Sequence, residues 1–249
     1  VTLAFFENLL PEGNVRAILE KWHHSEGAFN TLSKYGEDCA GALVITSKKS
    51  PPKVKIKEAN LEIELSEIYE SIDENKGAVD LIADKSPGYL SIAGAQDKFP
   101  CIFENGKIYL PKSGEPTTHI VKTPIIVKGI KESVYNEYFC MKACSYAKLP
   151  TPEFYISDDF KMFVMKRFDI LEDGTYLGFE DMCVLTARGV ENKYEGSYEE
   201  CARVIKDIIS PQYKKESLKI FFKSLVMNHF LKNGDAHLKN FGLIYNAYI

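Results

Sequence analysis

An Asp and an Asn five positions apart stand near the C-terminus, in the stretch Asn-Gly-Asp-Ala-His-Leu-Lys-Asn at positions 233–240. Phosphotransferase catalytic loops use this spacing, because one carboxylate must face the acceptor hydroxyl while an amide oxygen one turn away holds a metal ion on the nucleotide. Asp235 would take the first task and Asn240 the second, with His237 between them. The stretch therefore indicates phosphoryl-transfer chemistry.

A helix before this stretch and a strand after it are predicted to hold it in place. Apolar side chains recur at i, i+3, i+4 and i+7 over positions 218–230, which predicts a buried helix that ends at Asn233-Gly234. Positions 241–245 are predicted to form a strand. A loop between a core helix and a strand is where a rigid scaffold presents catalytic groups, although a polar turn that only caps the helix also explains positions 233–235.

Lys122 and Glu137 fit the same chemistry from two other elements. Lys122 lies at the end of a strand predicted at 118–122, and Glu137 lies in a helix predicted at 134–149. An ammonium on a rigid strand reaches the α- and β-phosphate oxygens of a nucleotide, and a carboxylate that pairs with it holds it there, as in kinases. Taken singly, a surface lysine and a glutamate on a solvated helix face are the simpler explanations.

A stretch of small residues, Ser-Ile-Ala-Gly-Ala-Gln-Asp-Lys at positions 91–98, is a candidate for a loop that covers the phosphates. Small side chains let backbone N–H groups approach anionic oxygens. The stretch lacks both the G-x-G-x-x-G and the P-loop patterns. An ordinary strand and turn therefore explain it as well.

The remaining elements are predicted from periodicity and turn signals. Asn105-Gly106 between two β-like runs is the strongest hairpin signal in the chain. Gly36 is predicted to be the C′ glycine of a helix at 28–35, and Pro51-Pro52 marks a linker. The other predicted elements are a strand end at 3–11, a helix through 15–22, strands at 41–46, 90–98, 154–156 and 162–167, a change from strand to helix within 58–76, and a loop with helical pieces around 180–196.

Composition and charge exclude several classes of protein. At 249 residues and 45% hydrophobic, the chain can bury the core of one large or two small globular domains. A net charge of −4 with scattered Lys and Arg offers no broad basic surface, so we expect DNA to be contacted only through a partner. There is no signal-peptide pattern, and no apolar run approaches the roughly 18 residues of a membrane span. We expect a cytoplasmic protein without membrane contact, with six reduced and mostly buried cysteines.

Several stretches, in order along nearly the whole chain, resemble the HipA family of serine/threonine kinase toxins from bacterial toxin–antitoxin pairs. The fold of that family is similar to that of phosphoinositide 3/4-kinases. The matching stretches are Phe-Phe-Glu-Asn-Leu-Leu-Pro-Glu at 5–12, Gly-Glu-Asp-Cys-Ala-Gly-Ala at 36–42, the small-residue stretch at 91–98, Thr-Thr-His-Ile-Val-Lys at 117–122, Asn-Glu at 136–137, Arg-Phe-Asp at 167–169, Glu-Asp-Met at 180–182 and Gly-Asp-Ala-His-Leu-Lys-Asn-Phe at 234–241.

The resemblance implies roles for individual residues. Asp235 would be the catalytic aspartate, with His237 beside it, and Asn240 a Mg²⁺ ligand. Lys122 would contact the phosphates of ATP and pair with Glu137. The other residues that the resemblance assigns to ATP binding are Gly94, Gln96 and Lys98 in the loop over the phosphates, and Lys166, Phe168 and Asp169 in a hinge at the adenine, with Asp169 near the ribose.

The resemblance also implies cofactors, partners and a means of control. The cofactors would be ATP and Mg²⁺, and the substrate a Ser or Thr of a protein, with an aminoacyl-tRNA synthetase as one candidate target. The partner would be a HipB-like DNA-binding antitoxin, which makes any contact with DNA indirect. Ser91 would be an autophosphorylation site, whose added charge displaces the loop over the phosphates and switches the kinase off.

We therefore predict a two-lobed, protein-kinase-like α+β fold that is truncated at both ends. Its parts would be a remnant of a HipA-like N-terminal subdomain at 1–57, a β-rich ATP-binding lobe at 58–170 and the start of a helical catalytic lobe at 171–249. The family has a second metal-binding Asp after the catalytic loop, and the sequence ends before such a residue, so we expect a fragment of a longer kinase. The alternatives are a non-catalytic pseudokinase that binds an antitoxin–DNA complex and a small-molecule or lipid kinase.

Overall fold

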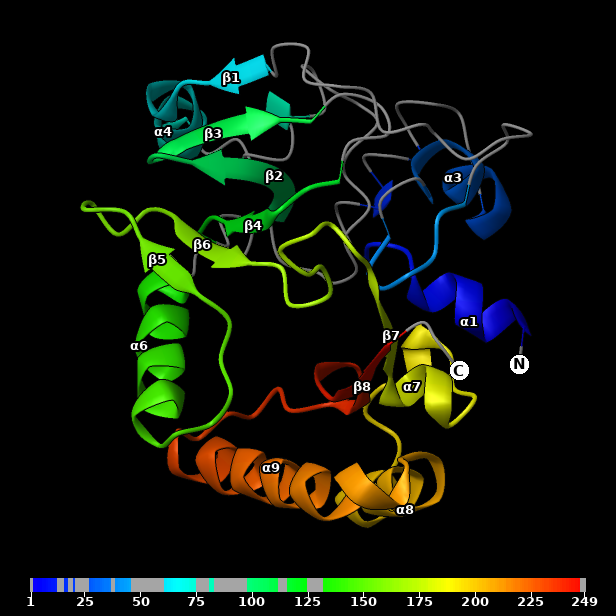
Figure 1. Cartoon of the computed structure of the whole chain (residues 1–249). Coiled ribbons are helices and arrows are strands. Elements are labelled where there is room, and N and C mark those ends of the chain that lie inside the picture. Colours follow the sequence, from blue (N-terminus) through cyan, green and yellow to red (C-terminus); the bar gives the residue numbers. More distant parts are fainter. Residues whose placement is uncertain are drawn as a thin grey trace.

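The computed structural model (Figure 1) describes residues 2–12, 16–17, 20, 27–36, 39–45, 61–74, 81–82, 98–111, 116–124 and 132–246. A six-stranded sheet lies at one end, helices lie at the other, and a two-stranded sheet lies between them (Figure 1). The predicted α+β class is confirmed. The linker at 47–57 and all but the last residue of the strand predicted at 90–98 lie outside the described residues.

The larger sheet is antiparallel, with the strand order β1-β3-β2-β4-β6-β5. Phe99 and Val121 from its centre pack with Ile68 of the helix α4 into one apolar core. The strands predicted at 118–122, 154–156 and 162–167 are confirmed as β4, β5 and β6, and the change within 58–76 as β1 and α4. The bounds are β1 Leu61–Ile63, α4 Leu65–Asp73, β2 Lys98–Glu104, β3 Lys107–Leu110, β4 His119–Lys122, β5 Phe154–Ile156 and β6 Phe163–Lys166.

The predicted hairpin is confirmed between β2 and β3. Asn105 and Gly106 have φ angles of 52° and 77°, so both central residues of the turn are left-handed. A two-residue turn of this kind matches the twist of the strands that it joins. Glu104 and Lys107 face each other directly beside the turn.

The helix α6 (Ser133–Tyr146) stands against β5 and β6 at one side of the sheet (Figure 1). It confirms the helix predicted at 134–149, but it ends at Tyr146. Lys148 adopts a φ of 57°, which stops the helix before Leu149. The helix places Glu137 beside the last residue of β4.

The helical end of the molecule is organised around the antiparallel pair β7–β8. Met182, Cys201, Phe221 and Leu238 from four different elements form its core. The region around 180–196 does contain helical pieces, but Glu180 and Asp181, expected to lie in a loop, are the last two residues of the strand β7, so the expectation is wrong for them. The elements are β7 Leu177–Asp181, α7 Met182–Leu185, η2 Val190–Asn192, α8 Tyr198–Ile208, α9 Pro211–Phe230, η3 Leu238–Asn240 and β8 Gly242–Asn246.

The long helix α9 is confirmed, but the expectation that it is buried is wrong for this chain. Phe221 is its buried residue, whereas Phe222 and Phe230 are 66% and 74% exposed. The reason is that α9 meets α8 and Phe241 along one stripe only. Among the described helices, none combines the length and the apolar character needed to cross a membrane.

The N-terminal residues form a helix, α1 (Thr2–Asn8), so the strand end predicted at 3–11 is wrong. Leu10 follows α1 and packs against Leu32 of α3 (Ala28–Tyr35), in a third apolar cluster. A short apolar run looks the same in a buried helix end as in a strand, which explains the error. The helix at 28–35 is confirmed, and the described part of the helix at 15–22 (residues 16–17 and 20) is helical.

Gly36 is needed for space rather than for a left-handed backbone. Its φ is −77°, so the predicted C′ conformation is wrong. A Cβ atom at this position would lie 2.6 Å from the Cβ of Ile45. The strand predicted at 41–46 is also wrong over its described part, since residues 41–45 form no strand and Gly41 has a φ of 83°.

We predict that Gly36→Ala lowers the free energy of unfolding by about 1–3 kcal/mol, because the added methyl group overlaps Ile45. Chemical denaturation measures the change. Gly234→Ala is the matched control, because its Cβ would meet nothing within 4 Å. Equal stability of the two variants would contradict the close approach.

Candidate active site

All three residues proposed for the catalytic loop lie together between α9 and β8. The side chain of Asp235 is 72% exposed and points into solvent. The Tyr194 hydroxyl donates a hydrogen bond of 2.7 Å to its Oδ1 atom, and the backbone N–H of Asp235 donates to Oδ1 of Asn233 at 3.0 Å. The carboxylate is thus both accessible to a substrate and held in one orientation.

His237 and Asn240 shape the loop from within. The Nε2 atom of His237 lies 4.0 Å from Oδ1 of Asp235, and its ring packs edge-to-face on Tyr194 at 5.0 Å between centroids. Burial lowers the pKa of His237 below its ordinary value, so the ring is neutral at pH 7. The amide nitrogen of Asn240 donates a hydrogen bond to the backbone carbonyl of Asp235, which closes the loop.

The donor set of this loop fits a magnesium ion in part. Because the amide nitrogen of Asn240 is used inside the loop, its side-chain oxygen is the atom left to bind a hard cation. No cluster of three or more His, Cys, Asp and Glu side chains suited to a metal occurs among the described residues. Mg²⁺ needs few protein ligands when a nucleotide supplies phosphate oxygens and water completes the shell. Asn240 is therefore a fitting ligand, but not a sufficient one.

A cluster of charges forms where β2, β4 and α6 meet. The Lys122 ammonium contacts Oε1 of Glu137, which confirms the expected pairing, and it lies 5.8 Å from the centroid of the Phe163 ring. Lys98 on β2 is directly opposite Lys122 on β4. Two cations and one carboxylate on neighbouring elements leave a net positive site, which suits polyphosphate.

The electrostatics of Lys98 connect the sheet to the catalytic loop. Burial, and after it the charge of Lys122, lower the pKa of Lys98 to about 7, although Glu137 and Glu12 act in the opposite direction. The charge of Lys239, in the loop at 233–240, also lowers the pKa of Lys98. Charges from the sheet, the N-terminal segment and the loop at 233–240 therefore all influence the protonation of Lys98.

The three residues proposed for the hinge have different surroundings. The Lys166 ammonium bonds Glu153 at 3.2 Å, and Lys166 lies at the opposite end of the β4–β6 pair from Lys122. Phe168 is 41% exposed and packs edge-to-face on Phe179 of β7, 5.3 Å between centroids. A half-exposed aromatic ring at a connection between two lobes suits stacking on a purine base.

Asp169 is buried in an ion pair. Arg167 donates to its two carboxylate oxygens, from Nε at 3.0 Å and from Nη2 at 2.8 Å, and the Gly41 N–H donates to Oδ2 at 2.8 Å. Arg167 also bonds Oγ1 of Thr117 and the carbonyl of Cys39. The structure gives Asp169 a structural task, and its contact with a ribose stays a prediction.

Sequence reasoning singled out the loop at 233–240 as catalytic, which stays a prediction, but it missed residues that orient Asp235 in the structure. Tyr194 bonds Asp235 from a position 41 residues earlier, and no local pattern points to it. Glu12 lies in one of the stretches that match the HipA family, yet no role was inferred for it. The predicted site residues Ser91, Gly94 and Gln96 lie outside the described residues.

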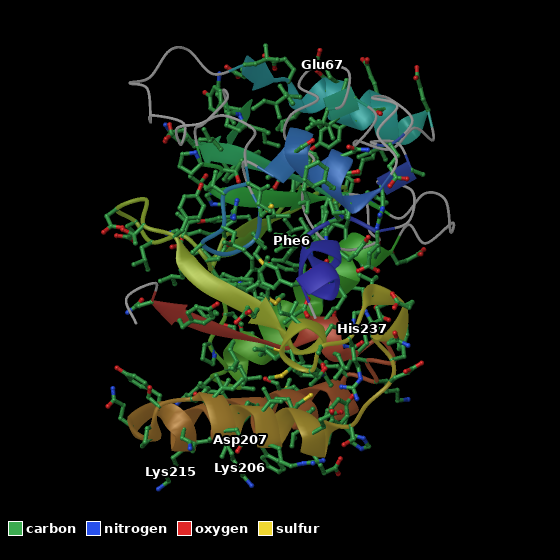
Figure 2. The ribbon with its side chains drawn as sticks, turned by 90° about the vertical axis from the view of Figure 1, so that its right-hand side faces the viewer. Phe6, Glu67, Lys206, Asp207, Lys215 and His237 are labelled. Atoms are coloured by element: carbon green, nitrogen blue, oxygen red, sulfur yellow. The ribbon has the colours of Figure 1, made fainter. Side chains whose placement is uncertain are left out.

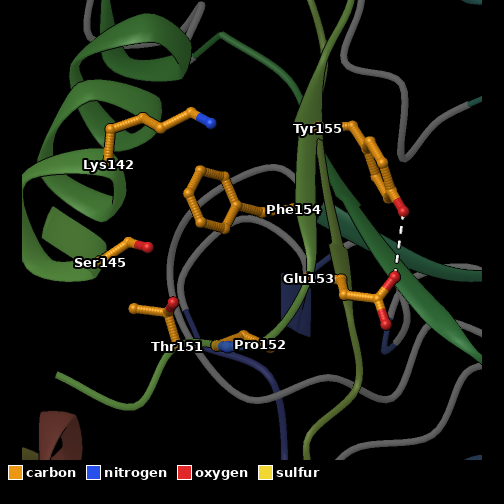
Figure 3. A pocket seen from close by; sticks show the side chains of 7 residues that line it. All are labelled: Lys142, Ser145, Thr151, Pro152, Glu153, Phe154 and Tyr155. Carbon is orange, nitrogen blue, oxygen red and sulfur yellow. Dashed lines mark hydrogen bonds between the residues drawn. The ribbon is translucent and has the colours of Figure 1, made fainter. Parts of the chain in front are cut away.

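A surface pocket between α6 and β5 is separate from these residues (Figure 3). The Lys142 ammonium lies 5.3 Å from the centroid of the Phe154 ring in it, and the Tyr155 hydroxyl donates to Glu153 at 3.1 Å (Figure 3). Its lining contains none of the proposed catalytic or phosphate-binding groups. The lining residues are Lys142, Ser145, Thr151, Pro152, Glu153, Phe154 and Tyr155.

Comparison with protein families gives two matches along the chain. The family described as the HipA-like C-terminal domain matches residues 90–248, which include Lys98, Lys122 and the catalytic loop. The family described as the HipA N-terminal domain matches residues 1–46, which include Glu12.

Two curated relatives come from Sinorhizobium fredii (strain NBRC 101917 / NGR234). The protein named "Putative kinase Y4mE" is 29% identical over 265 residues, and "Putative kinase Y4dM" is 26% identical over 266 residues. Each alignment covers 97% of this chain, but only 60% and 58% of the two relatives. The chain thus spans less than two thirds of the length of the curated relatives that it matches.

The fold is similar to that of a solved chain from the complex of HipA, HipB and operator DNA of the Shewanella oneidensis MR-1 toxin–antitoxin system. The TM-score is 0.77 at 21% sequence identity, and the match covers 99% of this chain and 61% of that chain. At this identity the similarity establishes the shared fold.

We predict that Asp169→Asn lowers the free energy of unfolding by about 3–5 kcal/mol, because it leaves the buried Arg167 without its charge partner. Burial raises the pKa of Asp169, but the hydrogen bonds and charge of Arg167 outweigh this effect and leave the pKa below its ordinary value. The stabilisation is therefore present above pH 4 and is lost as the pH falls through the lowered pKa.

Denaturation at several pH values measures this effect, with the exposed Asp158→Asn as control. The gap between wild type and Asp169→Asn should be widest near neutral pH and narrow in acid. A variant as stable as the wild type, with weakened nucleotide binding, would instead favour the ribose role.

Proposed function

Because the chain belongs to the HipA family, as the matches over residues 1–46 and 90–248 show, we propose that it acts as an ATP- and Mg²⁺-dependent kinase on Ser or Thr of a protein. The observation that carries the proposal is the cluster of Lys98, Lys122 and Glu137, in which Lys98 is affected by the charge of Lys239 from the loop that holds Asp235 and Asn240. These groups supply the positive charge, metal ligand and carboxylate that γ-phosphate transfer requires.

Asp235 would orient the acceptor hydroxyl and accept its hydrogen bond as the oxygen attacks the γ-phosphate. An exposed carboxylate is accessible to a bulky protein substrate, and the hydrogen bond from Tyr194 limits its rotation. His237 stays neutral and supports the loop from below through its contact with Tyr194. The negative charge of Asp235 would thus act on the acceptor hydroxyl.

Lys122 and Lys98 would bind the phosphate oxygens, with Glu137 holding Lys122 in position. Mg²⁺ bound through Asn240 would neutralise charge on the β- and γ-phosphates. Backbone amides near Gly94 and Gln96 would cover the phosphates, a role that rests on the resemblance alone. Together these groups would orient ATP for in-line transfer.

The base and ribose of ATP would bind at the connection between β6 and β7. The exposed face of Phe168 is suited to the adenine, and the adjacent backbone to its hydrogen bonds. Lys166 would lie at the edge of this binding site. Asp169 would lie near the ribose while it keeps its bonds to Arg167.

Partners and control follow from the family. The solved complex contains HipA, HipB and operator DNA, which supports a HipB-like antitoxin as partner of this chain and an indirect contact with DNA. Autophosphorylation of Ser91 would displace the loop over the phosphates, and an aminoacyl-tRNA synthetase is one candidate substrate. Both ideas rest on the resemblance to the family.

We predict that Asp235→Asn in the full-length protein lowers the rate of phosphate transfer by about 10²–10⁴-fold. The amide cannot accept the proton of the substrate hydroxyl, whereas ATP binding by Lys122 and Lys98 is retained. Transfer of labelled phosphate measures the rate, and relief of growth inhibition in cells provides a second readout. A wild-type protein that binds ATP without transferring phosphate would favour a pseudokinase and contradict the proposal.

We predict that the affinity for ATP falls as the pH rises above 7, by at most about tenfold per pH unit. Lys98, with a pKa of about 7, is mostly neutral above that pH. Lys98 must therefore take up a proton when ATP binds, and this uptake becomes less favourable as the pH rises. Lys98→Arg is the matched control, because a guanidinium stays charged and should bind ATP equally from pH 7 to 9. His237 is already neutral over this range.

Nucleotide titrations at fixed ionic strength measure both proteins. A wild-type affinity that stays constant from pH 7 to 9 would contradict a role for Lys98 at the phosphates. Equal pH dependence in Lys98→Arg would assign the titration to another group.

A further inference from the structure

Lys239 lies in the catalytic loop, yet its side chain points away from the exposed carboxylate of Asp235. Only 6% of the side chain is exposed. The ammonium donates to the carbonyl of Asn8 at 3.1 Å and to its Oδ1 at 2.9 Å. It also lies 3.3 Å from Asp181 and 3.8 Å from Glu12. The residue directly before Asn240 is therefore anchored to the N-terminal segment.

A second anchor joins the same segment to the other side of the loop. The Lys193 ammonium donates to Oε2 of Glu12 at 2.7 Å. The Lys193 carbonyl accepts the N–H of Leu238 at 3.0 Å, and the next residue, Tyr194, holds Asp235. Glu12 thus contacts both Lys193, which precedes Tyr194, and Lys239, which precedes Asn240.

The N-terminal segment makes a third contact with this part of the molecule. The side-chain amide of Asn8 donates to the carbonyl of Arg188 at 3.0 Å, just before η2. Helix α1 contacts both α7 and η2. Figure 2 shows α1, marked by Phe6, directly above the region of His237. The contacts thus join the N-terminal segment to α7, to η2 and to both sides of the loop at 233–240.

The contacts of Glu12 with Lys193 and Lys239 join opposite charges and are largely shielded from solvent. Glu12 is 12% exposed and Lys193 18%. Burial lowers the pKa of Lys193, but its hydrogen bond to Glu12 outweighs this effect, and the pKa lies above its ordinary value. A buried ammonium that loses its carboxylate moves toward water or toward another acceptor. Loss of Glu12 would therefore shift the lysines and the residues attached to them.

We propose that Asn8 and Glu12 are positioning residues for phosphate transfer, which hold Asp235 and Asn240 in place through Lys193 and Lys239. This inference rests on the proposed kinase function. Asn8 and Glu12 themselves would supply no group to the reaction. Loss of Glu12 would misplace the acceptor carboxylate and the metal ligand, while Lys98 and Lys122 keep their positions on paired strands of the sheet.

The test compares Glu12→Gln with Glu7→Gln in the full-length protein. Glu7 is the matched control, because it lies in the same segment and bonds Arg16 rather than the catalytic loop. We expect Glu12→Gln to lower kcat by about 10- to 100-fold, the loss that a small misplacement of reacting groups causes. Both constants are measured at pH 6, because Glu12 raises the pKa of Lys98, which lies at about 7, and at pH 6 Lys98 stays largely protonated in both variants. There, KM for ATP should change less than kcat, and Glu7→Gln should leave both constants at their wild-type values.

Amide hydrogen exchange at residues 233–241 separates this proposal from the proposed function. Exchange in the loop should speed up in Glu12→Gln and stay unchanged in Glu7→Gln, whether or not the protein has kinase activity. If the wild type transfers no phosphate, the proposed function fails and exchange alone decides the positioning role.

Lys193→Met provides a second variant should Glu12→Gln not fold. It removes the ion pair from the loop side and should give the same faster exchange and lower kcat. In a double-mutant cycle, the loss of kcat in Glu12→Gln with Lys193→Met should be well below the product of the single losses. A folded Glu12→Gln protein with wild-type kcat and wild-type exchange in the loop would overturn the proposal.

Discussion

The buried pair of Arg167 and Asp169 is the contact on which the arrangement of the molecule depends. It lies in the connection that leaves the six-stranded sheet for β7, and its guanidinium also bonds Thr117 and the carbonyl of Cys39. The N–H of Gly41 closes the network from the N-terminal part. Arginine suits this position because its planar fork serves several acceptors while staying charged. Three parts with separate apolar cores are thus joined by one polar centre.

The charged side chains of the site are of two kinds, those that are paired with an opposite charge and Asp235, which is exposed. Glu137 pairs with Lys122, and Glu12 pairs with Lys193, so the charges that position other groups are half-buried and compensated. Asp235 has no such compensation from a cation at hydrogen-bonding distance among the described residues and stays exposed, held by the neutral Tyr194. A carboxylate engaged in a strong ion pair would be a poorer acceptor for a substrate proton. The geometry leaves the Asp235 carboxylate accessible, while the hydrogen bond from Tyr194 orients it.

Predictions from the sequence were accurate where the physics is local. The hairpin at Asn105-Gly106 follows from the backbone preferences of its two central residues, and α9 follows from its periodicity. Predictions failed where a distant segment decides the conformation. Gly36 is set by the approach of Ile45, and β7 becomes a strand because β8 pairs with it. The exposed side of α9 shows the same limit, since periodicity states which residues are apolar but not whether a partner covers them.

The sequence by itself determined that Asp235 and Asn240 lie five positions apart on a loop between a helix and a strand, and this spacing is the basis for predicting phosphoryl transfer. Such spacing acts within one turn of chain, where local geometry leaves few alternatives. Only the tertiary structure decided that Tyr194 orients Asp235, that Lys98 faces Lys122, and that Glu12 supports the loop from the opposite end of the chain. Those contacts depend on which surfaces meet when the cores are buried, and no short window of sequence encodes that outcome.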